Sequence, residues 1–494
     1  MIEGGGWTLL AILASSGIIG VIIFFLAEER HGLRAALNLF GATVKLILVG
    51  FITWGYVDGQ TYEVRYAFVL DFDLVLRVDA LSLLFAGLSS TLWLITTVYA
   101  IGYMEGSPRR SRFFGFFSLC VTATMGITFS GNLITFVLFY EMLTITTYPL
   151  VVHRGTNVAL DAGRTYLMYT VVGGTTLLVG VVWLHAIAGP VEFGGGGVLG
   201  EVAEGNSWQL RAIFVVLVAS LGVKAALVPF HGWLPTAMVA PAPVSALLHA
   251  VAVVKAGAYG IIRVVHYVYG SDLADSLDVL LPLAIAASFT IVFGSLRALA
   301  QEDIKKRLAF STVSQLSYIT LGAALLGPIA AVGALVHLVH QGIMKVTLFF
   351  CAGNMAETLG IHNVSEMDGV ARRMPATMTA FTVGAIGMIG LPPIAGFISK
   401  WHLGLGALEA GQEWVILILA TSTLLNAAYF LPPIYAAWFK QPHEEYPPAE
   451  GRLETSWLLL LPALTTAMLS LLAGMLAAMP YSPLDLAGLA VNPS

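Results

Sequence analysis

GVKAALVPFHGWLP, residues 222–235, closes an apolar segment that begins near residue 209. The segment is apolar enough to cross a bilayer, but this closing stretch contains Lys224 and two prolines. A lysine at mid-membrane costs roughly 2.5–3.5 kcal/mol, and proline removes a backbone hydrogen-bond donor. A broken helix survives at membrane depth only where its freed carbonyl groups are buried in protein or meet water. The stretch therefore predicts a polar site inside a membrane bundle.

A second apolar segment is interrupted in the same way by GLPPIAGFISK, residues 390–400. Pro392 and Pro393 break the helix, and Lys400 follows seven residues after the second of them. Paired broken helices in the two halves of a transporter mark an inverted repeat, with the site between the halves. The two stretches therefore predict matching breaks in the seventh and twelfth membrane spans.

Composition places the chain in the membrane. Of its 494 residues, 57% are hydrophobic and 11% are charged, whereas a soluble domain carries about 25% charged residues. The net charge of −5 is spread out, without the basic patch that nucleic acid requires. Cys120 and Cys351 lie in apolar segments and have no CxxC motif, which favours packing roles. We therefore predict lipid contact, no nucleic acid partner, no cofactor, no metal site and no active-site chemistry of the chain's own.

Apolar runs predict an all-α polytopic membrane protein. A crossing needs about 20 apolar residues, and backbone groups in lipid must be satisfied within the segment, so the spans must be helices. Fourteen spans are predicted, at 7–26, 35–56, 79–103, 113–130, 132–152, 164–188, 209–229, 243–267, 278–299, 308–326, 329–352, 376–402, 411–438 and 455–478.

Loop charges predict the orientation. Loops after odd-numbered spans hold most of the arginines and lysines outside the spans, whereas loops after even-numbered spans are acidic, apart from Arg65 and Arg77. Cytoplasmic loops are enriched in Lys and Arg, so both termini are predicted on the outer side. An even number of spans agrees. We expect a multi-pass protein of the cell inner (plasma) membrane.

Ionisable side chains inside the spans form a polar seam, which a path for protons or cations across a membrane requires. Such residues are functional candidates by default. Glu141 lies near the middle of its span, nine residues after Asn132, and an adjacent ammonium would keep it ionised. It is therefore predicted to pair with Lys224. The candidate proton-transfer groups are Glu141, Lys224, Lys255 and Lys400, with His249, His337 and Lys345 as a proton relay.

Two histidine patterns suggest relays, because histidine titrates near neutral pH. His249 precedes Lys255 by six residues, about a third of a turn off one helix face, so their direct contact is left open. His337, Gln341 and Lys345 are spaced i, i+4, i+8 and share one helical stripe. His340 lies to one side of that stripe.

Each of these groups also has a structural alternative. Glu141 could be a helix-packing carboxylate bonded to a neighbouring hydroxyl group, and the lysines could snorkel toward an interface. Any single histidine could be a core residue bonded to a carbonyl group. Lys45, deep in its span without a local partner, is assigned a structural or lipid-facing role.

Five motifs together resemble a known family. They look like the antiporter-like subunits of respiratory complex I, the D-type subunit of Mrp multisubunit cation/proton antiporters, and related subunits of membrane-bound hydrogenases. The resemblance covers most of the chain, from about Asp79 to the thirteenth span. The motifs are FYE at 139–141, GVKAALVPFHGWLP at 222–235, PAPVSALLH at 241–249, VKAG at 254–257 and RALAQEDIKKRLAFSTVSQ at 297–315.

The resemblance implies fourteen helices with two inverted five-helix repeats. It also implies a Glu141–Lys224 pair, a central Lys255 and a terminal exit residue, Lys400. Some complex I subunits have glutamate at that last place, so Lys400 and HQGIMK at 340–345 favour the Mrp D-type and hydrogenase branch. The implied division is 1–112 for helices 1–3, 113–267 for the first repeat, 278–438 for the second repeat and 439–494 for helix 14 with an outer tail.

The implied function is proton translocation, with coupling to Na⁺ left open, by a subunit in contact with other integral membrane subunits of the same complex. The first alternative is a proton-pumping subunit of a complex I-like dehydrogenase or membrane-bound hydrogenase, which would make the chain part of a redox-driven ion translocase. The remaining alternatives are a stand-alone transporter and a scaffold whose charges only dock its neighbours.

Cysteine labelling tests the orientation. The segment 297–307 carries four cations, Arg297, Lys305, Lys306 and Arg307, so we expect it on the inner side. In a background with both native cysteines replaced, a cysteine at Asp303 should react with an impermeant maleimide in inverted vesicles and not in intact cells. A cysteine at Asp275, in an acidic loop, should show the reverse. Labelling of the 303 site from the outer face alone would overturn the orientation.

Overall fold

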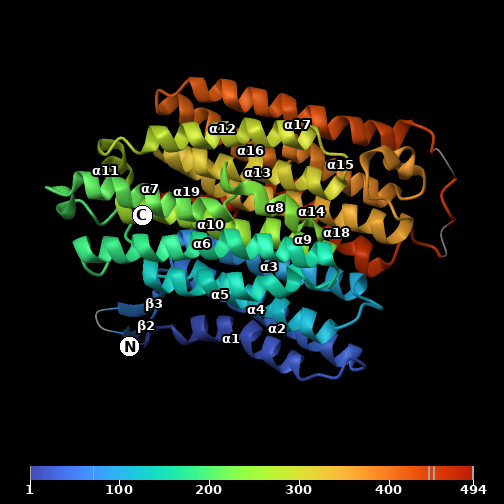
Figure 1. Ribbon diagram of the computed structural model, residues 1–494, viewed down its shortest axis with the longest axis horizontal. Helices are drawn as coiled ribbons and strands as arrows, with labels where there is room; N and C mark the ends of the chain where they lie inside the picture. Colours follow the sequence, from blue (N-terminus) through green and yellow to red (C-terminus); the bar gives the residue numbers. More distant parts are fainter. Residues whose placement is uncertain (1, 70–71, 443–444, 449–450, 492–494) are drawn as a thin grey trace.

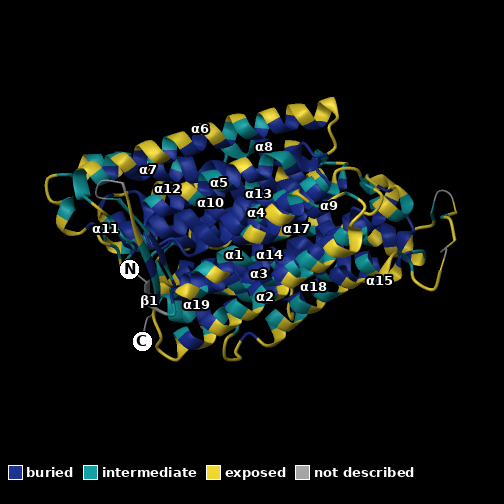
Figure 2. Cartoon of the chain, turned by 90° about the horizontal axis from the view of Figure 1, so that it is seen from below, coloured by how far each residue is buried: buried dark blue, intermediate teal, exposed yellow. Residues whose placement is uncertain are grey.

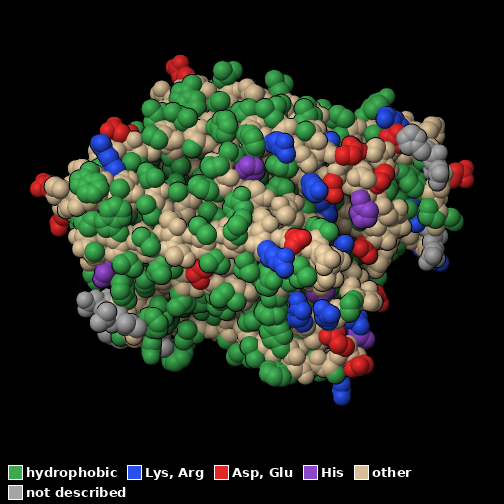
Figure 3. Space-filling model, in the orientation of Figure 1, with side chains coloured by type: hydrophobic (Ala, Val, Ile, Leu, Met, Phe, Trp, Pro, Cys, Tyr) green, Lys and Arg blue, Asp and Glu red, His purple; other side chains and the backbone are tan. Residues whose placement is uncertain are grey.

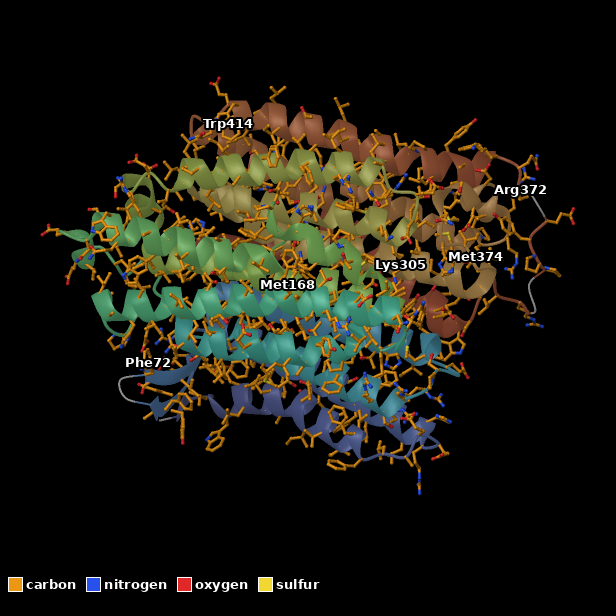
Figure 4. The ribbon with its side chains drawn as sticks, in the orientation of Figure 1. Phe72, Met168, Lys305, Arg372, Met374 and Trp414 are labelled. Atoms are coloured by element: carbon orange, nitrogen blue, oxygen red, sulfur yellow. The ribbon has the colours of Figure 1, made fainter. Side chains whose placement is uncertain are left out.

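The computed structural model describes residues 2–69, 72–442, 445–448 and 451–491. Its helices run roughly along one common direction, and both termini lie at the same end of the bundle (Figure 1). Phe72 lies near that end, whereas Arg372 and Met374 lie at the opposite end (Figure 4). The predicted all-α membrane fold is confirmed, because helices account for nearly all of the regular structure in the described residues.

Eleven of the predicted spans are single helices. Nine of these, along with two of the remaining spans, are long and apolar enough to cross a membrane, which gives eleven such segments among the described residues. The two single helices that fall outside this class, α4 and α13, carry cations in their first turns and many hydroxyl groups. The helices are α1 Trp7–Phe24, α2 His31–Val57, α3 Ala80–Tyr103, α4 Arg110–Thr128, α5 Leu133–Val151, α6 Asn157–Ala188, α12 Leu280–Leu299, α13 Ile304–Ala324, α14 Pro328–Leu359, α17 Trp414–Phe439 and α18 Trp457–Met475.

The seventh and twelfth spans are broken as predicted. Helix α7 (Ser207–Lys224) ends at Lys224, and the chain continues through η2 (Phe230–Gly232), α8 (Trp233–Thr236) and η3 (Ala237–Val239). The indole nitrogen of Trp233 donates to the carbonyl oxygen of Val223 at 2.7 Å, which satisfies one of the acceptors freed by the break. The twelfth span is divided into α15 (Pro375–Ile389) and α16 (Ala395–Glu409).

The eighth span is irregular, which its sequence did not indicate. It is built from α9 (Ala242–Ala246), the π-helical turn η4 (Leu247–Val251), α10 (Val253–Ile262) and a second π-helical turn, η5 (Arg263–Tyr269). Its most apolar stretch is completely buried inside the protein. Single π turns inside α-helices occur frequently at functional sites. Because this span is buried, both of its candidate residues, His249 and Lys255, lie in the protein interior.

The core lies along α10, α13 and α14, which are largely buried, whereas outer helices such as α6 and α18 carry exposed residues (Figure 2). Almost every residue of α13 is buried, and α14 contacts α3, α13, α15, α16 and α18. Phe40, Val172 and Leu424 are examples of large apolar side chains exposed on the outer helices. In a chain of this composition such side chains face lipid or neighbouring subunits. The inner helices can therefore carry polar side chains, because the outer helices separate them from the lipid.

A small sheet at the terminal end was not predicted. Strands β1 (Ile2–Gly4), β2 (Tyr62–Val69) and β3 (Phe72–Arg77) are antiparallel in the order β1-β2-β3. The sheet accounts for the two cations that depart from the loop-charge pattern, because Arg65 and Arg77 both form ion pairs with Glu63 and Glu192. Burial raises the pKa of Glu192, but hydrogen bonds from both arginines outweigh it and hold that pKa below its ordinary value.

The remaining short elements lie in the connections. The predicted outer tail contains a helix, α19, which contacts α3 and α14. On the face shown in Figure 3, most Lys and Arg side chains gather toward the end opposite the termini. These elements are η1 Glu201–Ala203, α11 Ser271–Ser276, η6 Val364–Met367, η7 Val370–Arg372 and α19 Pro483–Val491.

A buried ion pair ties the first three helices to the eighth span. The guanidinium group of Arg263, 1% exposed, donates to both carboxylate oxygens of Asp79, at 2.5 and 2.9 Å, and to the hydroxyl of Tyr259 at 2.6 Å. Asp79 also caps α3 by accepting from the Ser82 backbone N–H at 2.7 Å. A two-point arginine–carboxylate contact of this kind is both strong and directional. It is therefore a fixed structural link.

Removing one charge of this pair should destabilise the protein. Asp79→Asn keeps an oxygen for the helix cap but leaves Arg263 buried without its counter-charge, which costs about 3–5 kcal/mol. We expect a lower midpoint of thermal unfolding in detergent, with exposed Asp58→Asn as the control. The double variant Asp79→Asn/Arg263→Met should recover most of the loss. An unchanged midpoint in Asp79→Asn would contradict a structural role for the pair.

Candidate functional site

Five elements supply the charged groups of the predicted seam. Lys224 ends α7, Lys255 lies in α10, and Lys345 lies in α14, and all three side chains are fully buried. Glu141 in α5 and Lys400 in α16 are partly buried. Within the described residues, none of the three buried lysines has a carboxylate within 4.0 Å. Their ammonium groups are solvated by neutral oxygens and aromatic rings instead.

Lys224 binds the residue next to Glu141 instead of Glu141 itself. Its Nζ atom donates to the main-chain oxygen of Tyr140 at 2.5 Å and lies 3.4 Å from the centre of the Tyr140 ring. A lysine over an aromatic face gains about 0.5–2 kcal/mol, more where it is desolvated. The prediction is contact through a salt bridge or through one water; among the described residues there is no salt bridge between the two, and Tyr140 supplies both acceptors of the ammonium. Contact through one water stays a prediction.

Glu141 points toward α6. One of its carboxylate oxygens, Oε1, is buried without a hydrogen-bond partner among the described residues. It packs on Gly174, where an added Cβ atom would overlap Oε1. The carboxylate is thus held in a space that exists because residue 174 has no side chain.

Lys255 meets α14 at the predicted stripe. Its Nζ atom donates to the main-chain oxygen of Leu338 at 2.6 Å and to the side-chain oxygen of Gln341. Gln341 therefore joins Lys255 to the helix that carries His337 and Lys345. The short contacts with two neutral oxygens stabilise an ammonium without fixing it in an ion pair.

Among the described residues, no hydrogen bond joins His249 to Lys255. It lies in the π-helical turn η4, and both ring nitrogens are buried without a partner there. The ring packs at 4.6 Å from the ring of Phe349. The π turn and the irregular backbone at Ala252, with φ −118° and ψ −86°, separate the two residues' helical faces. The relay role of His249 stays a prediction.

The other two histidines lie on α14 with different surroundings. His337 shares a hydrogen bond of 2.8 Å with the hydroxyl of Ser399 on α16, and its ring is 5.2 Å from that of Tyr318. His340 is buried, and neither of its ring nitrogens has a partner among the described residues. His337 therefore links the stripe on α14 to the helix of Lys400.

Lys345 binds oxygens of α13, and Lys400 binds main-chain oxygens at the end of α15. Lys345 donates to the main-chain oxygen of Leu308 at 3.1 Å and to Ser311 Oγ at 2.7 Å, both on α13. Lys400 donates to the main-chain oxygens of Met388 at 3.0 Å and Ile389 at 2.9 Å, the last carbonyls of α15. Lys400 also borders an apolar groove between α16 and α17 of about 550 Å³.

Sequence reasoning missed several polar groups that complete the site. Tyr140, Gln341 and Ser311 accept hydrogen bonds from Lys224, Lys255 and Lys345, respectively. From the sequence, only Gln341 was placed near a lysine. Polar residues in otherwise apolar spans were the available signal. The structure also decides between the two roles left open for Lys45. Its side chain is buried, donates to Ser16 Oγ at 2.5 Å and has its ammonium 4.9 Å from the Trp93 ring. Its role is structural and not lipid-facing.

The chain matches two family models. Residues 130–426 match the family described as "NADH:quinone oxidoreductase/Mrp antiporter, TM". Residues 67–114 match "NADH-Ubiquinone oxidoreductase (complex I), chain 5 N-terminus". The first match includes every candidate residue from Glu141 to Lys400.

Curated relatives carry names from both branches of that family. The N subunit of the NADH-quinone oxidoreductase of Desulforudis audaxviator is 37% identical over 70% of this chain and 69% of its own length. The A/B subunit of a probable K⁺/H⁺ antiporter of Rhizobium meliloti is 30% identical over 86% of this chain, which spans 43% of that protein. The D subunit of the Na⁺/H⁺ antiporter of Bacillus subtilis is 27% identical over 82% of this chain and 80% of its own length.

Two solved structures share the fold. A chain of the archaeal membrane-bound sulfane sulfur reductase superposes with a TM-score of 0.85 at 22% identity, covering 98% of this chain and 96% of its own. A chain of the Mrp complex from Dietzia superposes with a TM-score of 0.82 at 22% identity, covering 99% and 97%. At these identities the likeness establishes the fold.

Proposed function

Because the chain belongs to the NADH:quinone oxidoreductase/Mrp antiporter membrane family, we propose that it moves protons across the membrane as one subunit of a multisubunit complex. The observation that carries this proposal is the set of three fully buried lysines held by neutral oxygens. A lysine in an ion pair is fixed in its charged form, whereas one bound only by carbonyl, amide and hydroxyl oxygens can release its proton.

The Glu141–Lys224 region would act as the gate. Lys224 sits on Tyr140, one residue from the carboxylate of Glu141, and so has two competing acceptors. When the ammonium moves onto the carboxylate, it holds its proton more tightly, because opposite charges attract strongly in a medium of low dielectric. When it returns to Tyr140, the proton is more easily passed to Lys255. Alternation between these positions regulates each transfer.

The later groups would carry the charge onward. A proton that enters from the inner side would pass from Lys224 to Lys255, then to Lys345 and Lys400, and leave toward the outer side or a neighbouring subunit. His249 and His337 are the relays of this route. Moving one charge against 100 mV requires about 2.3 kcal/mol, a size that a change of lysine partner can supply. Both termini on the outer side and two inverted repeats belong to the same proposal.

The cation/proton antiporter branch is favoured by Lys400 and by the relatives named as antiporter subunits. In that case a second cation such as Na⁺ moves against the proton, and the partner subunits carry it. The similarity to the N subunit of an NADH-quinone oxidoreductase supports the second candidate, in which a redox module drives proton pumping through this chain. The proteins that co-purify with the chain decide between the two.

Proton uptake into inverted vesicles that contain the assembled complex tests the proposal. Wild-type vesicles should acidify when the driving gradient or electron donor is supplied, and the rate is normalised to assembled complex. A purified, active monomer would favour a stand-alone transporter. Full uptake by complexes in which Lys224 and Lys255 are both replaced by Met would favour a scaffold.

The gate makes a prediction at a position that carries no charge. Gly174→Ala should displace the Glu141 carboxylate without unfolding the protein, because the overlapping atom is the end of a flexible side chain. Proton uptake per complex should then fall by about 100-fold, as it should in Glu141→Ala, since proton-transfer groups contribute about 10²–10⁴-fold.

The matched control is Gly50→Ala on α2, where an added Cβ meets nothing within 4 Å. Both variants should assemble with partner subunits to the wild-type extent. Wild-type uptake by assembled Gly174→Ala and Glu141→Ala complexes would remove Glu141 from the mechanism.

Substitutions at Lys400 distinguish a role in proton exchange from a role that only caps carbonyl groups. Lys400→Ala should abolish coupled uptake, whereas Lys400→Glu should retain part of it, because a glutamate can also exchange protons. If Lys400 only caps Met388 and Ile389, the alanine variant should unfold at lower temperature while surviving complexes still pump. The measurements are uptake per assembled complex and the thermal midpoint. Wild-type uptake in Lys400→Ala would leave Lys345 as the exit residue.

A further inference from the structure

A line of hydrogen bonds leaves Lys345 through two helices. Lys345 Nζ donates to Ser311 Oγ at 2.7 Å, and Ser311 Oγ lies 2.9 Å from the hydroxyl of Tyr429. The Tyr429 hydroxyl donates to the side-chain oxygen of Asn426 at 2.5 Å. All four side chains are fully buried. We call Ser311, Tyr429 and Asn426 the hydroxyl–amide line.

The line ends on an oxygen that Lys400 also binds. The side-chain nitrogen of Asn426 donates to the main-chain oxygen of Met388 at 3.3 Å. Lys400 Nζ donates to the same oxygen at 3.0 Å. The hydroxyl–amide line therefore connects Lys345, on α14, with the α15 carbonyl that holds Lys400. The two donors share one oxygen freed by the helix break, and a carbonyl oxygen that accepts two hydrogen bonds holds each donor less tightly than one donor alone.

Chemistry fixes the direction of every bond in the line. The Met388 carbonyl can only accept, so Asn426 must turn its NH₂ group toward it and its oxygen toward Tyr429. The Tyr429 hydroxyl must then donate its single hydrogen to Asn426, so Ser311 must donate to Tyr429. Ser311 has no hydrogen left for Lys345 and must accept from it. An ammonium at Lys345 therefore favours the observed arrangement of all three groups.

A neutral Lys345 favours the opposite arrangement. Its lone pair can accept the Ser311 hydrogen, which frees Tyr429 to donate to Ser311 in place of Asn426. Asn426 then loses the contact that orients it on Met388, and the Met388 oxygen is left to Lys400. No proton crosses Asn426 in either arrangement, because an amide relay would require its nitrogen to give up a hydrogen to a carbonyl group. The line transmits orientation only.

We propose that Tyr429 is a positioning residue that links the charge on Lys345 to the hold on Lys400: a charged Lys345 keeps Asn426 on Met388 and so loosens Lys400. The two lysines are then disfavoured from being charged together, and arrival of a proton at Lys345 promotes its release at Lys400. This coupling rests on the proposed function of the same seam. It is carried by neutral groups, which sequence motifs of charged residues do not reveal.

Other charged and titratable groups face the two lysines and stay unchanged in the test. Arg307 donates to the main-chain oxygen of Tyr429 at 3.0 Å and holds that turn of α17 in place. The groups within electrostatic range of Lys345 or Lys400 are Lys255 on α10, His249 on η4, His337 on α14 and Tyr318 on α13.

Removing one hydroxyl tests the coupling. In Tyr429→Phe, Asn426 is no longer oriented on Met388, so Lys400 should keep its proton to higher pH. The pH at which proton uptake is half-maximal should move upward by about one unit, a tenfold change in proton affinity. In Ser311→Ala, Tyr429 can no longer donate to position 311 and still donates to Asn426, so the midpoint should not rise. Ser311→Thr, which retains the hydroxyl, should behave like the wild type. Exposed Tyr435→Phe on the same helix is the control.

The outcomes separate this inference from the proposed function. An upward shift in Tyr429→Phe that is absent from Ser311→Ala and vanishes in a Lys400→Glu background supports the coupling. An unshifted midpoint in Tyr429→Phe, a shift that persists in Lys400→Glu, or an equal upward shift in Ser311→Ala or Tyr435→Phe overturns it, while wild-type uptake still supports proton translocation. Wild-type complexes that take up no protons would instead sink the proposed function.

Discussion

The cost of burying a charge away from water governs this structure. A buried ammonium needs several oxygens around it, and in a helix interior the main-chain oxygens are already used. The breaks supply oxygens that are free: Lys400 binds the last carbonyls of α15, which the break at Pro392 and Pro393 exposes. The break in the twelfth span and Lys400 are thus one feature. Lys224, Lys255 and Lys345 instead share main-chain oxygens of the unbroken helices α5, α14 and α13, and polar helices such as α13 add hydroxyl groups to the same interior.

Local patterns were sufficient for the fold and for part of the site. Every one of the fourteen predicted spans falls on helical segments, and eleven segments among the described residues are long and apolar enough to cross a membrane. Proline near lysine located both breaks. The i, i+4, i+8 spacing placed Gln341 between His337 and Lys345, and the structure puts Lys255 on that residue. These successes share a cause: each depends on residues close in sequence, whose relative positions the helix geometry sets.

Pairs between distant segments could not be predicted in this way. Asp79 and Arg263 are 184 residues apart, and no periodicity relates them. The same holds for Arg65 on β2 and Glu192 in the connection after α6, whose ion pair explains a cation that departs from the loop-charge rule. For Glu141 and Lys224, sequence reasoning did not foresee that Tyr140 offers the ammonium a carbonyl oxygen and a ring face.

Arg263 and the buried lysines of the seam are held by different kinds of partner. Arg263 is always charged and is held by a carboxylate at two points, so its charge stays where the fold needs it. The three buried lysines of the seam have only neutral partners, and lysine loses its proton far more readily than arginine when desolvated. The Arg263 charge is thus fixed by a carboxylate, whereas the seam lysines are held by dipoles. Such dipoles can rotate, so the hydroxyls of Ser311 and Tyr429 report a change at one lysine to the next without carrying charge themselves.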